Sequence, residues 1–148
     1  MPPQIPQVYV HQIIGEFPSR VLSRPATIAT TGNTDEYIIC PISGNLITVD
    51  FSGVSALAAS DTNYITFTIT NLGQAGAGSA AMLAATDANT TKATGGTALS
   101  ANTKRQLTLS ATPNSTQVVE GDRLLIRAAV TGTLAGTVTF PTYMLRFI

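Results

Sequence analysis

The chain of 148 residues has little charge, few aromatic side chains and few side chains that bind metals. Only 11% of its residues are Asp, Glu, Lys or Arg, against about 25% in an ordinary soluble domain. Tryptophan is absent, and His11 and Cys40 are the only histidine and cysteine. A zinc or iron site needs several converging ligands, so this composition predicts no metal centre. A single cysteine excludes an intrachain disulfide.

The residues of common catalytic sites are missing or stand in unsuitable patterns. A Ser-His-Asp triad would depend on His11, and no Gly-x-Ser-x-Gly pattern is present. Glu120 and Asp122 flank Gly121, which is typical of a turn into a strand. The glycine-rich residues 73–78 match neither dinucleotide-binding nor P-loop spacing. We therefore expect no enzyme activity, no cofactor and no small-molecule substrate.

The formal net charge is zero, with eight basic and eight acidic residues. This balance gives no electrostatic basis for binding nucleic acid or an anionic membrane. No apolar run approaches the roughly 20 residues of a membrane span, and the N-terminus lacks the pattern of a secretion signal. A charge near zero favours self-association.

A hydropathy pattern of period two dominates the chain after residue 36. In residues 62–70, Ile65, Phe67 and Ile69 share one face and threonines occupy the other. This alternation is typical of strands with one buried face. We predict eight strands, at residues 37–41, 46–51, 62–70, 80–85, 105–111, 116–119, 123–131 and 137–147. Short strands separated by frequent turns predict an all-β sandwich or barrel.

Three local features refine this prediction. Cys40 ends an apolar run and is expected to be a buried, inert thiol. Pro141 coincides with a phase slip, which predicts a break or bulge in the last strand. Residues 74–79 are expected to be flexible, and residues 87–103 to form a long loop or an irregular hairpin. Between them, residues 80–85 could be a strand or a short helix, because the run is too short for periodicity to decide.

Residues 1–36 are predicted to form an extended N-terminal arm, and residues 37–148 the β-domain. Five of the eight prolines lie in the first 25 residues, which excludes a helix or a central strand there. The arm is nevertheless apolar, unlike a disordered tail, so it is expected to lie on its own domain or on another chain. The candidate contact residues are Ile5, Val8, Tyr9, Val10, Ile13, Ile14, Phe17, Val21 and Leu22.

Arg123 and Arg127 are candidate contact residues on the β-domain. They share one face of the strand at residues 123–131, opposite Leu124 and Ile126. Together with Lys104 and Arg105 they would form a small basic patch. This patch is either a solvated outer face or a docking surface for an acidic subunit.

Three stretches resemble the head decoration proteins, or cement proteins, of tailed bacteriophages. They are residues 61–73, residues 91–99 with 105–110, and residues 119–127 with 135–138. The resemblance covers residues 46–148 and implies a jelly-roll-like antiparallel β-sandwich on the outer surface of the virion, made in the host cytoplasm. Such proteins bind where subunits of the major capsid protein meet, often as homotrimers or dimers, and brace the shell. The arm would then contact capsid subunits or neighbouring copies.

Three other functions remain open at this point. A carbohydrate- or receptor-binding module of a phage tail or fibre would need converging aromatic and polar side chains. A cupin-type enzyme would need several metal-binding histidines, and this chain has one. A minor capsid or head-completion protein would differ from a decoration protein in its copy number on the particle.

Overall fold

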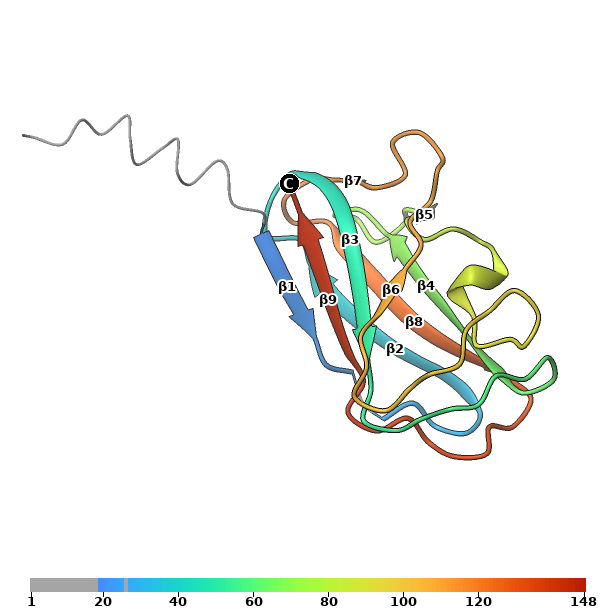
Figure 1. The fold of residues 1–148 in the computed structure, drawn as a ribbon. Coiled ribbons are helices and arrows are strands. Elements are labelled where there is room, and N and C mark those ends of the chain that lie inside the picture. Colours follow the sequence, from blue (N-terminus) through green and yellow to red (C-terminus); the bar gives the residue numbers. More distant parts are fainter. Residues whose placement is uncertain (1–18, 26) are drawn as a thin grey trace, which may run out of the picture.

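The structure, a computed structural model, describes residues 19–25 and 27–148 (Figure 1). Almost all of its regular structure is β-strand, with one short 3-10 helix, η1, at Asp87–Asn89. The strands of the described residues are β1 (Ser19–Ser23), β2 (Gly32–Ile39), β3 (Gly44–Ser52), β4 (Tyr64–Asn71), β5 (Ala80–Ala81), β6 (Arg105–Leu107), β7 (Gln117–Val118), β8 (Arg123–Thr131) and β9 (Thr142–Phe147).

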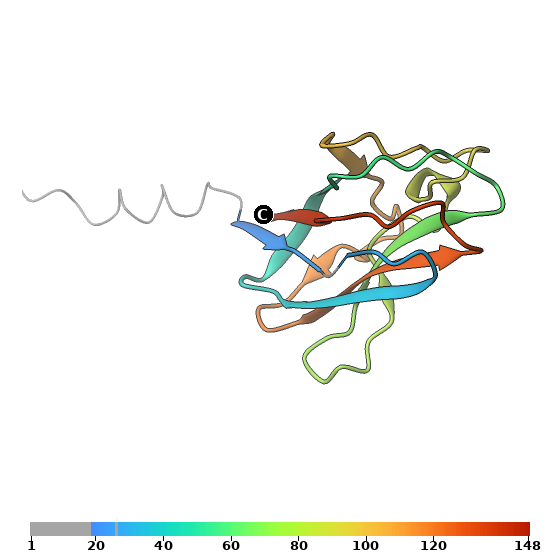
Figure 2. The same cartoon turned by 90° about the horizontal axis from the view of Figure 1, so that it is seen from below.

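The strands form two antiparallel sheets that pack face to face (Figure 2). One sheet has the order β1-β9-β3-β6, with the two-residue β7 paired to β3, and the other has the order β2-β8-β4-β5. Without β7, the eight remaining strands alternate between the sheets along the chain, except that β4 and β5 are neighbours in the same sheet. This is the strand order of a jelly roll, so the predicted all-β, jelly-roll-like sandwich of about eight strands is confirmed.

The core lies between the sheets and is built by the alternation seen in the sequence. Ile65, Phe67 and Ile69 are each at most 1% exposed, whereas Thr68 between them is exposed. The ring of Phe67 lies 4.7 Å from that of Phe51 and 6.3 Å from that of Tyr143, measured between centroids. Aromatic rings at these separations attract one another beyond the burial of their area.

Several predicted strand boundaries change in the structure. The strand expected at residues 80–85 is reduced to Ala80–Ala81, and the strand expected at residues 105–111 ends at Leu107. The break at Pro141 is confirmed, because β9 begins at Thr142 and Phe140 has a φ of +48°. The ends of short strands are the hardest to predict from sequence, because irregular hydrogen bonds replace the regular pairing between strands there.

The long segment between β4 and β6 is held by side-chain hydrogen bonds to backbone groups. Asn89 is 1% exposed and its amide donates to the carbonyls of Ala84 and Thr108 at 2.8 Å, while its oxygen accepts from the Thr108 N–H. The guanidinium of Arg105 donates to the carbonyls of Ala88, Thr90 and Thr97. These bonds tie backbone groups outside the named strands to the side chains of Asn89 and Arg105.

The predicted domain boundary at residue 37 does not coincide with the edge of the sandwich. All five residues of β1 pair with β9, and β2 already begins at Gly32. Val21 packs against the core from β1. Of the predicted arm, β1 therefore belongs to one sheet and the first residues of β2 belong to the other. The rest of the predicted arm, residues 1–18, lies outside the described residues.

Within residues 19–25 and 27–148, no helix has the length and apolar character that a bilayer crossing requires. In the same residues, no three His, Cys, Asp or Glu side chains gather as a metal site would require.

Candidate interaction surface

The two sides of the sandwich differ in how their edges are closed. On the side of β5 and β6, backbone bonds cross from one sheet to the other. The Ala84 N–H donates to the Thr108 carbonyl at 3.0 Å, and the Ser110 N–H donates to the Met82 carbonyl at 2.9 Å. Leu83 and Leu109 form an isolated bridge between these bonds. This side therefore leaves few unpaired backbone groups.

On the opposite side, the outer edge of β2 has no strand beside it among the described residues. The Leu72 N–H donates to the Arg123 carbonyl, which shows that the odd-numbered residues of β8 bond toward β4. Backbone groups alternate in direction along an antiparallel strand, so the even-numbered residues of β8 bond toward β2. Their partners are Gly32, Thr34, Glu36 and Ile38. The N–H and C=O groups of Asn33, Asp35, Tyr37 and Ile39 consequently point away from the sheet.

The outer edge of β1 likewise has no strand beside it within residues 19–25 and 27–148. Asn45 and Ile148 exchange two backbone hydrogen bonds, which shows that the even-numbered residues of β9 bond toward β3. The odd-numbered residues of β9 therefore bond to β1, at Ser19, Val21 and Ser23. This leaves the backbone groups of Arg20 and Leu22 at the free edge.

The free edges of β1 and β2 lie on one side of the sandwich, one in each sheet (Figure 2). We call these two edge strands the open side. Three large apolar side chains on these strands are solvent-exposed: Leu22 by 58%, Tyr37 by 52% and Ile39 by 68%. An exposed edge with apolar side chains is a template for pairing with another strand. The open side is therefore a candidate surface for a protein partner.

Both candidate arginines lie on the outer face of β8, but each already has a partner. The guanidinium of Arg127 donates two hydrogen bonds of 2.7 Å to the carboxylate of Asp35 on β2. These bonds lower the pKa of Asp35 below its ordinary value. The guanidinium of Arg123 lies over the ring of Tyr37, at 5.4 Å from the centroid. Both arginines thus join β8 to the free-edged strand β2.

The other two cations of the predicted basic patch belong to a different sheet. The ammonium of Lys104 lies 3.6 Å from a carboxylate oxygen of Asp50 on β3. Arg105 is held by loop carbonyls, and burial lowers its pKa. The structure therefore does not bring the four cations together, and Arg123 and Arg127 stand alone as the pair on the four-stranded sheet.

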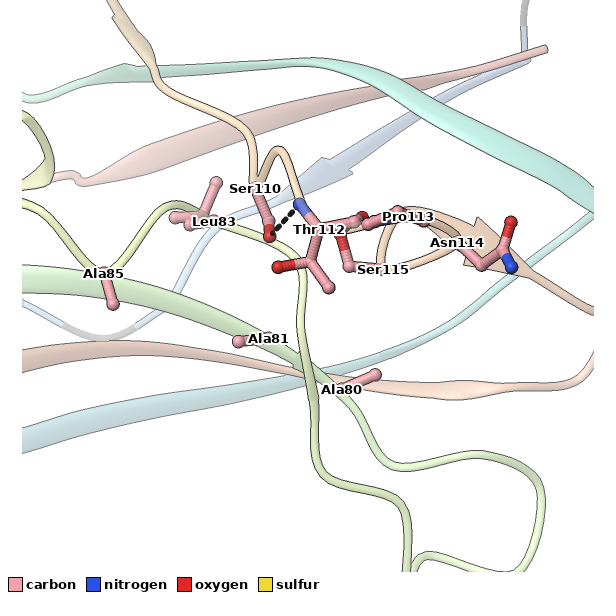
Figure 3. Close-up of a pocket in the computed structure, with 9 residues that line it drawn as sticks. All are labelled: Ala80, Ala81, Leu83, Ala85, Ser110, Thr112, Pro113, Asn114 and Ser115. Atoms are coloured by element: carbon pink, nitrogen blue, oxygen red, sulfur yellow. Dashed lines mark hydrogen bonds between the residues drawn. The ribbon is translucent and has the colours of Figure 1, made fainter.

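Two hollows near β5 contain little that could act on a substrate. The first, of about 370 Å³, is lined by alanine, leucine, serine, threonine, proline and asparagine side chains (Figure 3). Its Ser110 hydroxyl accepts a bond from the Thr112 N–H at 3.2 Å. The adjoining hollow, of about 320 Å³, has one titratable lining residue, Asp87, whose carboxylate is paired with Lys92 at 2.8 Å. Neither hollow holds a pair of groups suited to acid–base catalysis.

The prediction that Cys40 is buried is confirmed. Its side chain is 1% exposed, and burial together with the nearby charge of Asp122 raises the thiol pKa to about 11. Because the thiolate is the reactive form, the native protein should not react with a thiol reagent at pH 8. In denaturant one thiol per chain should react, which absorbance at the reagent's product band measures. Rapid labelling of the native protein would show that Cys40 reaches solvent.

The structure places two of the nine candidate arm residues. Val21 is half-buried against the core, and Leu22 is exposed on the open side. The other seven, Ile5 to Phe17, lie outside the described residues. Sequence reasoning did not select Tyr37 or Ile39 as contact residues, because nothing in the sequence shows that their strand lies at an edge.

Comparisons with protein-family models, curated proteins and solved structures find no match for this chain. Jelly rolls occur in capsid proteins, lectins and cupins alike, so the fold does not select among these functions.

Proposed function

We propose that the protein is a structural component of a virion that binds the outside of the major capsid lattice, stabilises the head and catalyses no reaction. The observation that supports this proposal is the open side, where two sheet edges present backbone groups that no described strand pairs, beside exposed apolar side chains. Such an edge bonds a partner through its main chain and needs no reactive group.

The charge of the molecule favours the same role. The net charge is zero, and both guanidinium groups beside the open side are already engaged, by Asp35 and Tyr37. Contacts made here therefore rest on apolar area and backbone hydrogen bonds. Copies arranged on a repeating shell gain avidity, since each bound neighbour raises the effective concentration of the next contact.

The carbohydrate-binding alternative receives less support from the exposed rings. Among the described residues, the large exposed aromatic side chains are Tyr37 and Phe140. Tyr37 lies near the end of β2, and the Arg123 guanidinium occupies one face of its ring. Phe140 precedes the start of β9. These two rings do not form a stacking platform for a sugar.

Sedimentation of the purified protein with bare capsids from the same source tests the proposal. We expect saturable binding at a fixed number of copies per capsid. Because ion pairs contribute little, raising the salt from about 0.1 M to about 1 M, which shortens the Debye length from about 10 Å to about 3 Å, should change the affinity less than tenfold. A protein that stays in the supernatant at saturating concentrations would overturn the proposal.

A further inference from the structure

We propose that the free edge of β2 binds residues 7–14 of a second copy of this chain, which add a strand to the four-stranded sheet. This inference deepens the proposed function and rests on it, because the proposed function assigns the N-terminal segment to contacts between chains. The partner is thus another copy of the chain, and the contact is a main-chain ladder.

The dimensions of the edge define what can occupy it. β2 has eight residues, from Gly32 to Ile39, and at about 3.4 Å per residue its edge is roughly 24 Å long. The backbone groups of four of these residues point outward, as the register with β8 requires. A strand of about eight residues satisfies all of them. The side chains of the same four residues lie on the exposed outer face of β2. Asn33, Tyr37 and Ile39 are uncharged, and the charge of Asp35 is paired with Arg127.

Residues 7–14 have the length and composition of such a strand. They are eight residues between Pro6 and Gly15, and they contain no proline, glycine, Asp, Glu, Lys or Arg. Five of the eight are residues that favour strands, namely Val8, Tyr9, Val10, Ile13 and Ile14. A strand laid on the β2 edge would also cover Tyr37 and Ile39, which are 52% and 68% exposed.

The connection to β1 favours a second copy over the same copy. Only residues 15–18 separate the segment from Ser19, where β1 begins in the other sheet. Four residues can carry the chain from one sheet to the other, as residues 40–43 do between β2 and β3. Within one copy, however, such a turn would lay residues 7–14 parallel to β2, because β1 begins at the end of the sandwich where β2 ends. A segment from a second copy can pair antiparallel, like the strand pairs of both sheets, and antiparallel pairing is the more stable per residue. Because the net charge of the chain is zero, two copies do not repel each other electrostatically.

Cysteine cross-linking between two distinguishable copies tests the proposal. In a Cys40→Ser background, one set of chains carries a single cysteine at one of positions 8–13. A second chain, with a mass tag, carries Tyr37→Cys. After mixing and mild oxidation without capsids, we expect disulfide-linked mixed dimers, strong at every second arm position and weak between. Thr68→Cys, on the outer face of the central strand β4, replaces Tyr37→Cys as the matched control and should give at least tenfold less product.

The outcomes separate the possible occupants of the edge. One variant carries both cysteines in the same chain. If it cross-links only within itself at high dilution, and no mixed dimer forms at any concentration, the proposal is overturned in favour of pairing within one copy. Failure of cross-linking at all six arm positions would also overturn it. Mixed dimers from a protein that ignores capsids would retain this inference and remove the proposed function. Capsid binding without mixed dimers would retain the proposed function and overturn this inference.

A proline variant gives a second, independent readout. Val10→Pro removes a backbone donor from the middle of the added strand without altering any described residue. Light scattering should show an oligomer for the unaltered chain at tens of micromolar and the mass of a single chain for Val10→Pro. Gln4→Pro, in a stretch that already contains Pro2, Pro3 and Pro6, is the matched control and should keep the oligomer. Equal masses for all three proteins would contradict the proposal.

Discussion

Replacing Phe67 with alanine should destabilise the sandwich by roughly 3–5 kcal/mol, the usual effect of deleting a buried aromatic side chain. The ring is 1% exposed and lies between the two sheets, in contact range of Phe51 and Tyr143. The guanidinium of Arg105 lies on it at 5.5 Å from the centroid. The substitution thus leaves a cavity at the point where three aromatic residues meet. The free energy of unfolding in urea measures the effect.

Thr68→Ala is the matched control for Phe67→Ala, because its side chain projects from the next position of β4 to the outer face. An exposed substitution of this kind changes stability by about 0.5 kcal/mol or less. Both variants alter the same strand and the same backbone, so their difference isolates the buried face. A loss below about 1 kcal/mol for Phe67→Ala would show that the ring does not anchor the core.

Much of the core could be predicted from the sequence because the rule behind it is local. Side chains alternate across a strand whatever the strand's neighbours, so the inward positions of Phe67 and Leu124 follow from their own segments. The break at Pro141 is local in the same sense, since proline removes a ladder donor. In each case the physical cause lies within a few residues of the feature that it produces.

The position of β1 could not be predicted, because its cause lies far away in the chain. Ser19–Ser23 is short and stands between Pro18 and Pro25, so composition alone favours an arm. It becomes a strand because β9, more than a hundred residues later, offers a complete antiparallel register from Ser23–Tyr143 to Ser19–Phe147. Pairing between distant segments overrides the local signal.

The candidate surface was hidden for a related reason. In the run at residues 37–40, Tyr37 and Ile39 point outward while Ile38 and Cys40 point inward. All four are apolar or aromatic, so periodicity cannot separate an edge strand from a strand that is buried on both faces. Only the strand order shows that β2 has one neighbour among the described strands.

Removing residues 1–18 should leave the sandwich folded, whereas removing residues 1–24 should destabilise it. The longer deletion takes away β1, whose three bonded positions pair with Tyr143, Leu145 and Phe147. At a net contribution of about 1 kcal/mol for each hydrogen bond, and with Val21 withdrawn from the core, the loss should reach several kcal/mol. Thermal unfolding followed by circular dichroism would compare the two truncated proteins with the full chain.

The same two proteins separate the role of the N-terminal segment in binding from a role in folding. If residues 1–18 act between chains, the shorter deletion should keep the melting temperature within a few degrees of the full chain, because the described sheets stay intact. It should also abolish the mixed-dimer formation and weaken capsid binding at least tenfold, because the added strand and its avidity are lost together. Unfolding of the shorter deletion would show instead that the segment completes the core of its own copy. Undiminished capsid binding would assign that contact to residues 19–148.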